Sequence, residues 1–150
     1  MNTLWPDYAL PCFWAFLACL GFTQIFNIRG VGKLICAVGG ALGWLIYLLC
    51  GSTIFAAFLS AAAIGMYSEL MARIRRCPVT CYLITALLPL VPGGGIYYAM
   101  SYCVAGEIDL FLSELLHTFG VAAALAVGSM LTASLFRVIY SHLRARRLRA

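Results

Sequence analysis

Five apolar runs, each long enough to cross a bilayer as a helix, constrain the fold of this 150-residue chain more than any other feature. They lie at about residues 8–28, 32–50, 54–72, 79–105 and 115–140. Apolar residues make up 64% of the sequence and charged residues only 10%, well away from the balance of soluble domains. Lipid supplies no partners for backbone N–H and C=O groups, so the runs must form helices. We therefore predict an all-α, polytopic integral membrane protein with five transmembrane helices.

The length of the chain suits one helical bundle. A span takes about 20 residues, so five spans and their connections use most of residues 1–150. We expect a single transmembrane domain that ends in a basic cytoplasmic tail at residues 141–150. The first charged residue is acidic, Asp7, and no basic segment precedes the first run, so the sequence does not predict a cleaved signal peptide.

The basic residues predict the orientation of the bundle. All ten fall on one side of a five-span arrangement, and the other side carries acidic residues only. Because cytoplasmic segments are enriched in Lys and Arg, we expect the N-terminus outside and the C-terminus in the cytoplasm, in the plasma membrane. The net charge of +5 is divided among several loops and does not indicate binding to nucleic acid. The ten basic residues are Arg29, Lys33, Arg73, Arg75, Arg76, Arg137, Arg144, Arg146, Arg147 and Arg149.

The fourth run contains helix breakers at its centre. Proline lacks an N–H and clashes with the preceding turn, and glycine loses much backbone freedom in a helix, so we expect the fourth span to be broken at Pro89–Gly95. Pro92 follows the cytoplasmic start of this run by about 13 residues, or roughly 20 Å of helix, which places it near the middle of the bilayer. Irregular backbone at that depth is expected only where protein covers it or where it lines a wet cavity.

The second half of the broken span would present its N-terminus to the middle of the membrane. We expect it to restart at Gly94 or Gly95, with free N–H groups and the positive end of the helix dipole forming a site for an anion. Hydroxyl groups on the same half-helix could contact a polar solute. The alternative is a simple kink that shapes packing. The predicted solute-binding residues are Pro89, Pro92, Gly93, Gly94, Gly95, Tyr97, Tyr98 and Ser101.

Three further polar residues are candidates for coupling or gating. Asn27 and Glu69 lie near the cytoplasmic ends of their runs, and His117 lies near the outer start of the fifth run. Each also has a simpler interpretation. Glu69 and Arg73 have the spacing and order of a helical ion pair, Asn27 could hydrogen-bond between helices, and His117 could simply be solvated.

The sequence contains no pattern that indicates catalysis or metal binding. Its seven cysteines lie mostly inside apolar runs and form no C-x-x-C pair, so they are interpreted as small apolar residues. No nucleophile–base pair and no paired intramembrane carboxylates occur. We therefore expect no metal, no cofactor and no enzyme. The acidic segment 107–114 is predicted to lie at the membrane interface as a separate piece before the fifth span. Small residues at four-residue spacing are interpreted as packing faces within the bundle, with dimerisation as the alternative.

The odd number of spans indicates a second subunit. Many secondary transporters consist of two inverted units with the solute site between them. No internal repeat is visible here, so the second unit would come from another polypeptide or from a copy of this one. The residues thus favour half of a transporter for small carboxylate-bearing solutes. The alternatives are a non-transporting scaffold subunit and, more weakly, an intramembrane enzyme.

The break also carries a family resemblance. Pro89-Leu90-Val91-Pro92-Gly93 followed by Tyr97 resembles the P-x-x-P-G-x-x-x-Y signature of the threonine/serine exporter family, and Gly21-Phe22 with Phe26-Asn27 is similar to its first span. The chain resembles the small subunit that corresponds to the C-terminal half of the full-length exporters. This resemblance implies export of threonine and serine, or of a dicarboxylate such as succinate. It also implies a partner, a membrane subunit corresponding to the N-terminal half. The run Gly93-Gly94-Gly95 is richer in glycine than expected for the family.

Overall fold

The computed structural model describes the backbone of residues 4–147 and the side chains of residues 8–141. Within residues 4–147 every regular element is helical, as the apolar runs predict. The elements in chain order are α1 (Leu4–Ile25), α2 (Gly32–Leu49), α3 (Ile54–Arg75), α4 (Val79–Leu87), the 3-10 turn η1 (Leu88–Leu90), α5 (Gly93–Ala105) and α6 (Ile108–Arg147).

These helices can cross a membrane up to five times. α1, α2, α3 and α6 are each long and apolar enough to span alone. The segments Val79–Leu90 and Gly93–Ala105 pass the same test only as a pair, with a bend of 42° between them. The prediction of an all-α polytopic membrane protein with a broken fourth span is therefore confirmed.

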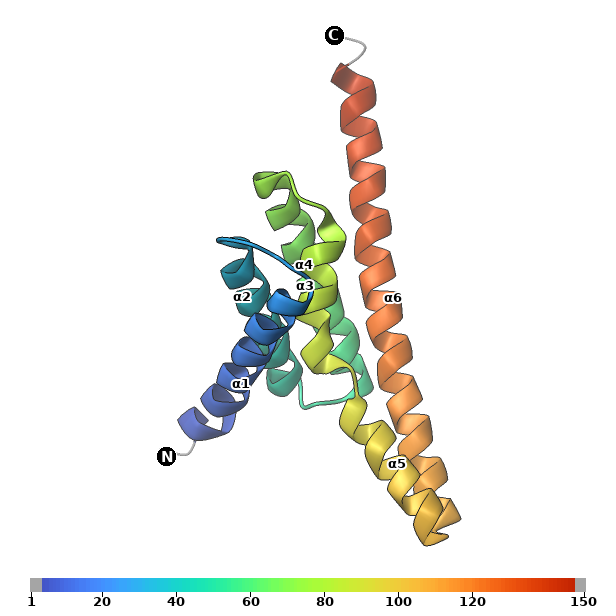
Figure 1. Cartoon of the computed structure of the whole chain (residues 1–150). Helices are drawn as coiled ribbons and strands as arrows, with labels where there is room; N and C mark the ends of the chain where they lie inside the picture. The colour runs from blue at the N-terminus through green and yellow to red at the C-terminus, as the bar shows by residue number, and fades with distance from the viewer. Residues whose placement is uncertain (1–3, 148–150) are drawn as a thin grey trace.

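The helices are arranged as a cluster of four with a long helix at its side (Figure 1). α2 packs against α1, α3 and α4, and α3 packs against α4 as well. α6 runs along α3 and continues past it, where α5 packs along its first turns. In Figure 1, α5 and the start of α6 extend away from α1, so α5 rests on α6 rather than on the cluster.

Small residues let these helices approach closely. An added Cβ at Gly128 of α6 would lie 2.6 Å from the backbone oxygen of Phe58 in α3, and one at Gly65 of α3 would collide with Thr132 of α6. Between α2 and α3, Gly43 has no room for a Cβ beside Ile64. Helices in lipid associate through close packing of this kind. The interpretation of the small-residue stripes as packing faces within one bundle is confirmed for these three glycines.

The acidic segment 107–114 leads directly into the long helix α6, which runs without a break from Ile108 to Arg147. Its location at the membrane interface stays a prediction. Between Ile108 and Gly120 the sequence has no proline or glycine to end a helix, and Asp109 in the first turn suits the positive end of the helix dipole. At about 1.5 Å per residue, α6 is roughly twice as long as the hydrocarbon core is thick, so it tilts or extends beyond the core.

The orientation of the bundle can be tested with the chain's own cysteines. Cys77 is exposed in the connection between α3 and α4, whereas Cys50 and Cys103 are exposed near the opposite ends of their spans. The distribution of basic residues predicts that a membrane-impermeant maleimide added to intact cells labels Cys50 and Cys103 but reaches Cys77 only after permeabilisation. Labelling of Cys77 alone in intact cells would reverse the predicted topology.

Candidate functional site

The break between α4 and α5 is made by a short turn with few hydrogen bonds. After α4 ends at Leu87, the N–H of Val91 donates to the carbonyl oxygen of Leu88 at 3.2 Å, and the N–H of Gly93 turns back onto the carbonyl of Val91. Pro89 and Pro92 have no N–H to contribute. α5 begins at Gly93, one residue earlier than the predicted restart at Gly94. The prediction that the span breaks at Pro89–Gly95 is otherwise confirmed.

The start of α5 leaves two backbone donors without an acceptor. The N–H of Ile96 already donates to the carbonyl oxygen of Pro92 at 3.4 Å. The N–H groups of Gly94 and Gly95 form no backbone hydrogen bond outside the helix's own ladder among the described residues. Free N–H groups in the first turn of a helix, together with its dipole, attract an anion.

These donors line a cavity of about 260 Å³ that three elements enclose. The break contributes one wall, α2 contributes two aromatic side chains, and α6 contributes an acidic, a basic and a hydroxyl side chain. The residues that line it outside the break are Trp44, Tyr47, Glu114, His117, Thr118 and Val121. We refer to this cavity as the break pocket.

Two side chains of the break pocket have buried polar atoms with no partner. They are the indole nitrogen Nε1 of Trp44 and the hydroxyl oxygen Oγ1 of Thr118, both unpaired among the described residues. Thr118 is only 4% exposed. A buried polar group without a partner costs about 1–3 kcal/mol, so a solute or water that pairs with these atoms would recover that free energy.

The three glycines of the break differ in what surrounds them. A Cβ added at Gly93 or Gly94 would meet no other atom within 4 Å, so the space beside them is open. A Cβ at Gly95 would collide with the hydroxyl of Thr118 on α6. Gly95 is therefore required for the close approach of α5 and α6, whereas Gly93 and Gly94 leave space through which a solute can reach the backbone.

The structure brings together some of the predicted site residues and not others. Pro89, Pro92, the three glycines and His117 all line the break pocket. Tyr97, Tyr98 and Ser101 do not line it; the tyrosines are 70% and 57% exposed and Ser101 is also exposed. The two tyrosine rings pack edge to face, with centroids 5.6 Å apart. These three residues lie on faces of α5 that nothing in the described chain covers.

The two remaining predicted residues, Asn27 and Glu69, lie at the other end of the bundle from the break. Asn27 follows the end of α1 with a φ of 52°, and its Oδ1 accepts a hydrogen bond from Nε of Arg29 at 3.4 Å. Glu69 forms the expected ion pair with Arg73, with 3.0 Å between Oε2 and Nη2. Neither lines the break pocket.

Four polar or aromatic residues of the break pocket are not among the predicted site residues: Trp44, Tyr47, Glu114 and Thr118. A signal for two of them exists. Glu114 and Thr118 are four residues apart, with His117 between them, which places a carboxylate, a hydroxyl and an imidazole on one side of a helix. Trp44 and Tyr47 carry no such signal, because their proximity to the break depends on how α2 packs.

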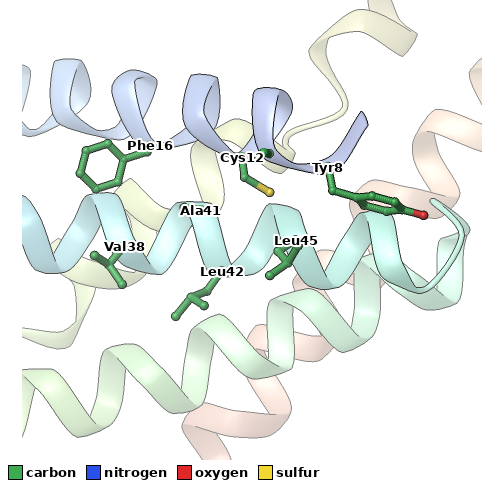
Figure 2. A pocket seen from close by; sticks show the side chains of 8 residues that line it. Tyr8, Cys12, Phe16, Val38, Ala41, Leu42 and Leu45 are labelled. Atoms are coloured by element: carbon green, nitrogen blue, oxygen red, sulfur yellow. The ribbon is translucent and has the colours of Figure 1, made fainter. Parts of the chain in front are cut away.

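A second cavity, between α1 and α2, has about 370 Å³ but a different character (Figure 2). Figure 2 shows Cys12 and Phe16 of α1 opposite Val38, Leu42 and Leu45 of α2. Its lining is almost wholly apolar, so it offers a polar solute nothing to bind. Among the described residues no group of three or more His, Cys, Asp or Glu side chains could hold a metal ion.

The fold and the break define a multi-pass helical membrane protein with a discontinuous span, an architecture typical of secondary transporters. Residues 11–135 match the family model described as "Threonine/Serine exporter, ThrE". This match covers most of the chain, so the chain belongs to that family, which is one of transporters and not of enzymes. No curated protein and no solved structure matches the chain.

The different surroundings of the glycines predict opposite effects of the same substitution. Gly95→Ala should lower the free energy of unfolding by about 1–3 kcal/mol, because the new methyl group collides with Thr118. Gly94→Ala should leave stability unchanged or raise it by up to about 1 kcal/mol, because the site is open and alanine favours a helix. Thermal unfolding of both purified variants in detergent measures the difference. Equal effects would contradict the packing of α5 on α6.

Proposed function

We propose that this chain is one half of a secondary transporter that exports small carboxylate-bearing solutes, threonine or serine first among them, across the plasma membrane. The observation that carries the proposal is the break pocket. It joins two free backbone amides, two unpaired buried donors and a carboxylate side chain at a break within a membrane span.

The free amides suit the carboxylate of the solute. The N–H groups of Gly94 and Gly95 lie at the positive end of α5, and the space where a Cβ of residue 94 would lie is open. A carboxylate there would accept hydrogen bonds from the backbone, which are stronger than neutral ones because the acceptor is charged. Binding through the backbone requires no particular side chain, which is consistent with three glycines in succession.

Other groups of the break pocket favour an amino acid over a dicarboxylate. Glu114 supplies a negative charge that would attract the ammonium group of an amino acid and repel the second carboxylate of succinate. The unpaired Oγ1 of Thr118 and Nε1 of Trp44 suit the hydroxyl of threonine or serine, since both can donate a hydrogen bond. We therefore place threonine and serine ahead of succinate as the transported solute.

The missing half would cover the exposed side of α5. Within the described chain α5 packs only against α6, and Val104 on it is 88% exposed. We propose that a second membrane subunit, corresponding to the N-terminal half of the exporters, packs against this side and brings Tyr97, Tyr98 and Ser101 into a shared site. The odd number of spans supports an inverted partner of this kind.

The energy source of export is proposed to be a proton gradient. His117 lines the break pocket, as Glu114 does, and is the proposed coupling residue. We propose Asn27 and Glu69 as gating residues at the cytoplasmic end of the bundle.

Filling the open space at Gly94 tests the transport site. Gly94→Leu should fold normally, because its side chain projects into open space, yet should abolish threonine export by obstructing the amides. Efflux of labelled threonine from cells that also hold the partner subunit measures this, with Gly94→Ala as the matched small variant. A scaffold subunit would behave differently, since export would continue at the normal rate in Gly94→Leu as long as the complex assembles.

The role of Glu114 predicts a change in solute preference. Glu114→Gln keeps the size of the side chain but removes its charge, so threonine export should fall by about tenfold or more, while succinate export is unchanged or rises. Competition between the two labelled solutes in the same cells gives the ratio directly. An equal loss for both solutes would rule out Glu114 as the partner of the ammonium group.

A further inference from the structure

A third cavity, of about 350 Å³, lies at the opposite end of α3 from its N-terminus and shares no residue with the break pocket. α3, the connection to α4, the start of α4 and the second half of α6 enclose it. Its charged lining consists of Glu69, Arg73 and Arg137, and Cys77 lies at its edge in the connection. We call it the arginine pocket.

The guanidinium group of Arg73 is contacted at one edge by a carboxylate and on its face by aromatic rings. Its Nη2 donates to Oε2 of Glu69 at 3.0 Å. The carbon at the centre of the guanidinium lies 3.5 Å from the centre of the Tyr140 ring and 5.5 Å from that of Phe136, both on α6. Stacking of this kind fixes the plane of the guanidinium and leaves its remaining N–H groups directed outward in that plane.

One donor of this ordered guanidinium is buried and unused. Nε of Arg73 has no hydrogen-bond partner among the described residues. A guanidinium presents pairs of parallel N–H groups that match the two oxygens of a carboxylate or phosphate. Glu69 takes a single contact, from Nη2, and no other hydrogen bond of the Arg73 guanidinium forms among the described side chains.

The arginine pocket also carries a positive charge that Glu69 does not balance. Arg137 reaches the same cavity from α6. Within the described side chains no carboxylate lies within 4.0 Å of it, and Arg73 and Glu69 form the ion pair at this end of the bundle. Two arginines face one glutamate, so the cavity attracts an anion.

We propose that the arginine pocket is a binding site for an oxyanion, either a carboxylate or a phosphate group, bound by the guanidinium groups of Arg73 and Arg137. The group could belong to a free solute or to the headgroup of an anionic lipid, since basic pockets between spans bind both kinds of ligand. The proposal requires no transport by the break pocket, so the two stand or fall separately.

Cys77 provides a direct test, because it is exposed and lines the arginine pocket. The full chain is purified in a neutral detergent, and the rate of maleimide labelling at each cysteine is followed by peptide mass spectrometry. Inorganic phosphate, succinate and L-threonine are added separately, with chloride at matched ionic strength as the control for screening. Nanodiscs of phosphatidylglycerol and of phosphatidylcholine form the lipid arm.

An oxyanion in the pocket should slow labelling of Cys77 by about fivefold or more relative to chloride or phosphatidylcholine, because it occupies the space beside the thiol. Labelling of Cys103, which is exposed at the far end of α5, should not change. Protection by soluble anions alone supports the proposal with a free solute as ligand. Protection by phosphatidylglycerol alone supports it with a headgroup as ligand.

Arg137→Gln separates specific binding from a general effect. Arg137 is exposed and forms no ion pair with the described residues, so the variant should fold. The ligand concentration needed to protect Cys77 from labelling should rise by about tenfold or more. Arg137→Lys should retain part of the protection of Cys77. Labelling of Cys77 that no anion or lipid slows, or protection that is the same in Arg137→Gln, would overturn the proposal.

Discussion

A backbone inside a membrane must find its hydrogen-bond partners within the protein, and the structure depends on how this chain meets that requirement. Four spans meet it with regular helices. The fourth span in chain order does not, because Pro89 and Pro92 lack N–H groups and Gly93 bonds only within a tight turn, which leaves the N–H groups of Gly94 and Gly95 free. Such a break persists only where other groups surround it. Here α2 and α6 surround it with aromatic, acidic and hydroxyl side chains, and the result is a polar pocket at the break.

The long helix α6 joins the two polar regions. Its first half places Thr118 against Gly95 and so fixes the position of α5 at the break. Its second half packs against α3 through Gly128 and Thr132, then carries Arg137 and Tyr140 to the arginine pocket. α6 therefore contributes residues to both pockets.

Much of the fold could be predicted from the sequence, because lipid makes composition and breakers decisive. The five spans, the break at Pro89–Gly95 and the Glu69–Arg73 pair all follow from local rules. The last helix begins at Ile108 and not near residue 115, because no residue in the acidic segment ends a helix. Part of the pocket could not be predicted. Trp44 and Tyr47 reach the break through the packing of α2, while the direction of α5 turns Tyr97 and Tyr98 away from it.

The most direct test of the account is to locate the solute itself. An amino acid that carries a diazirine is photoactivated in membranes that contain the chain and its partner, and the labelled peptides are identified by mass spectrometry. The account predicts label on the break, at residues 89–95, and on the facing part of α6, at residues 114–121, with excess threonine removing it. Label that is absent from both segments, or that threonine does not displace, would contradict the claim that the break binds the solute.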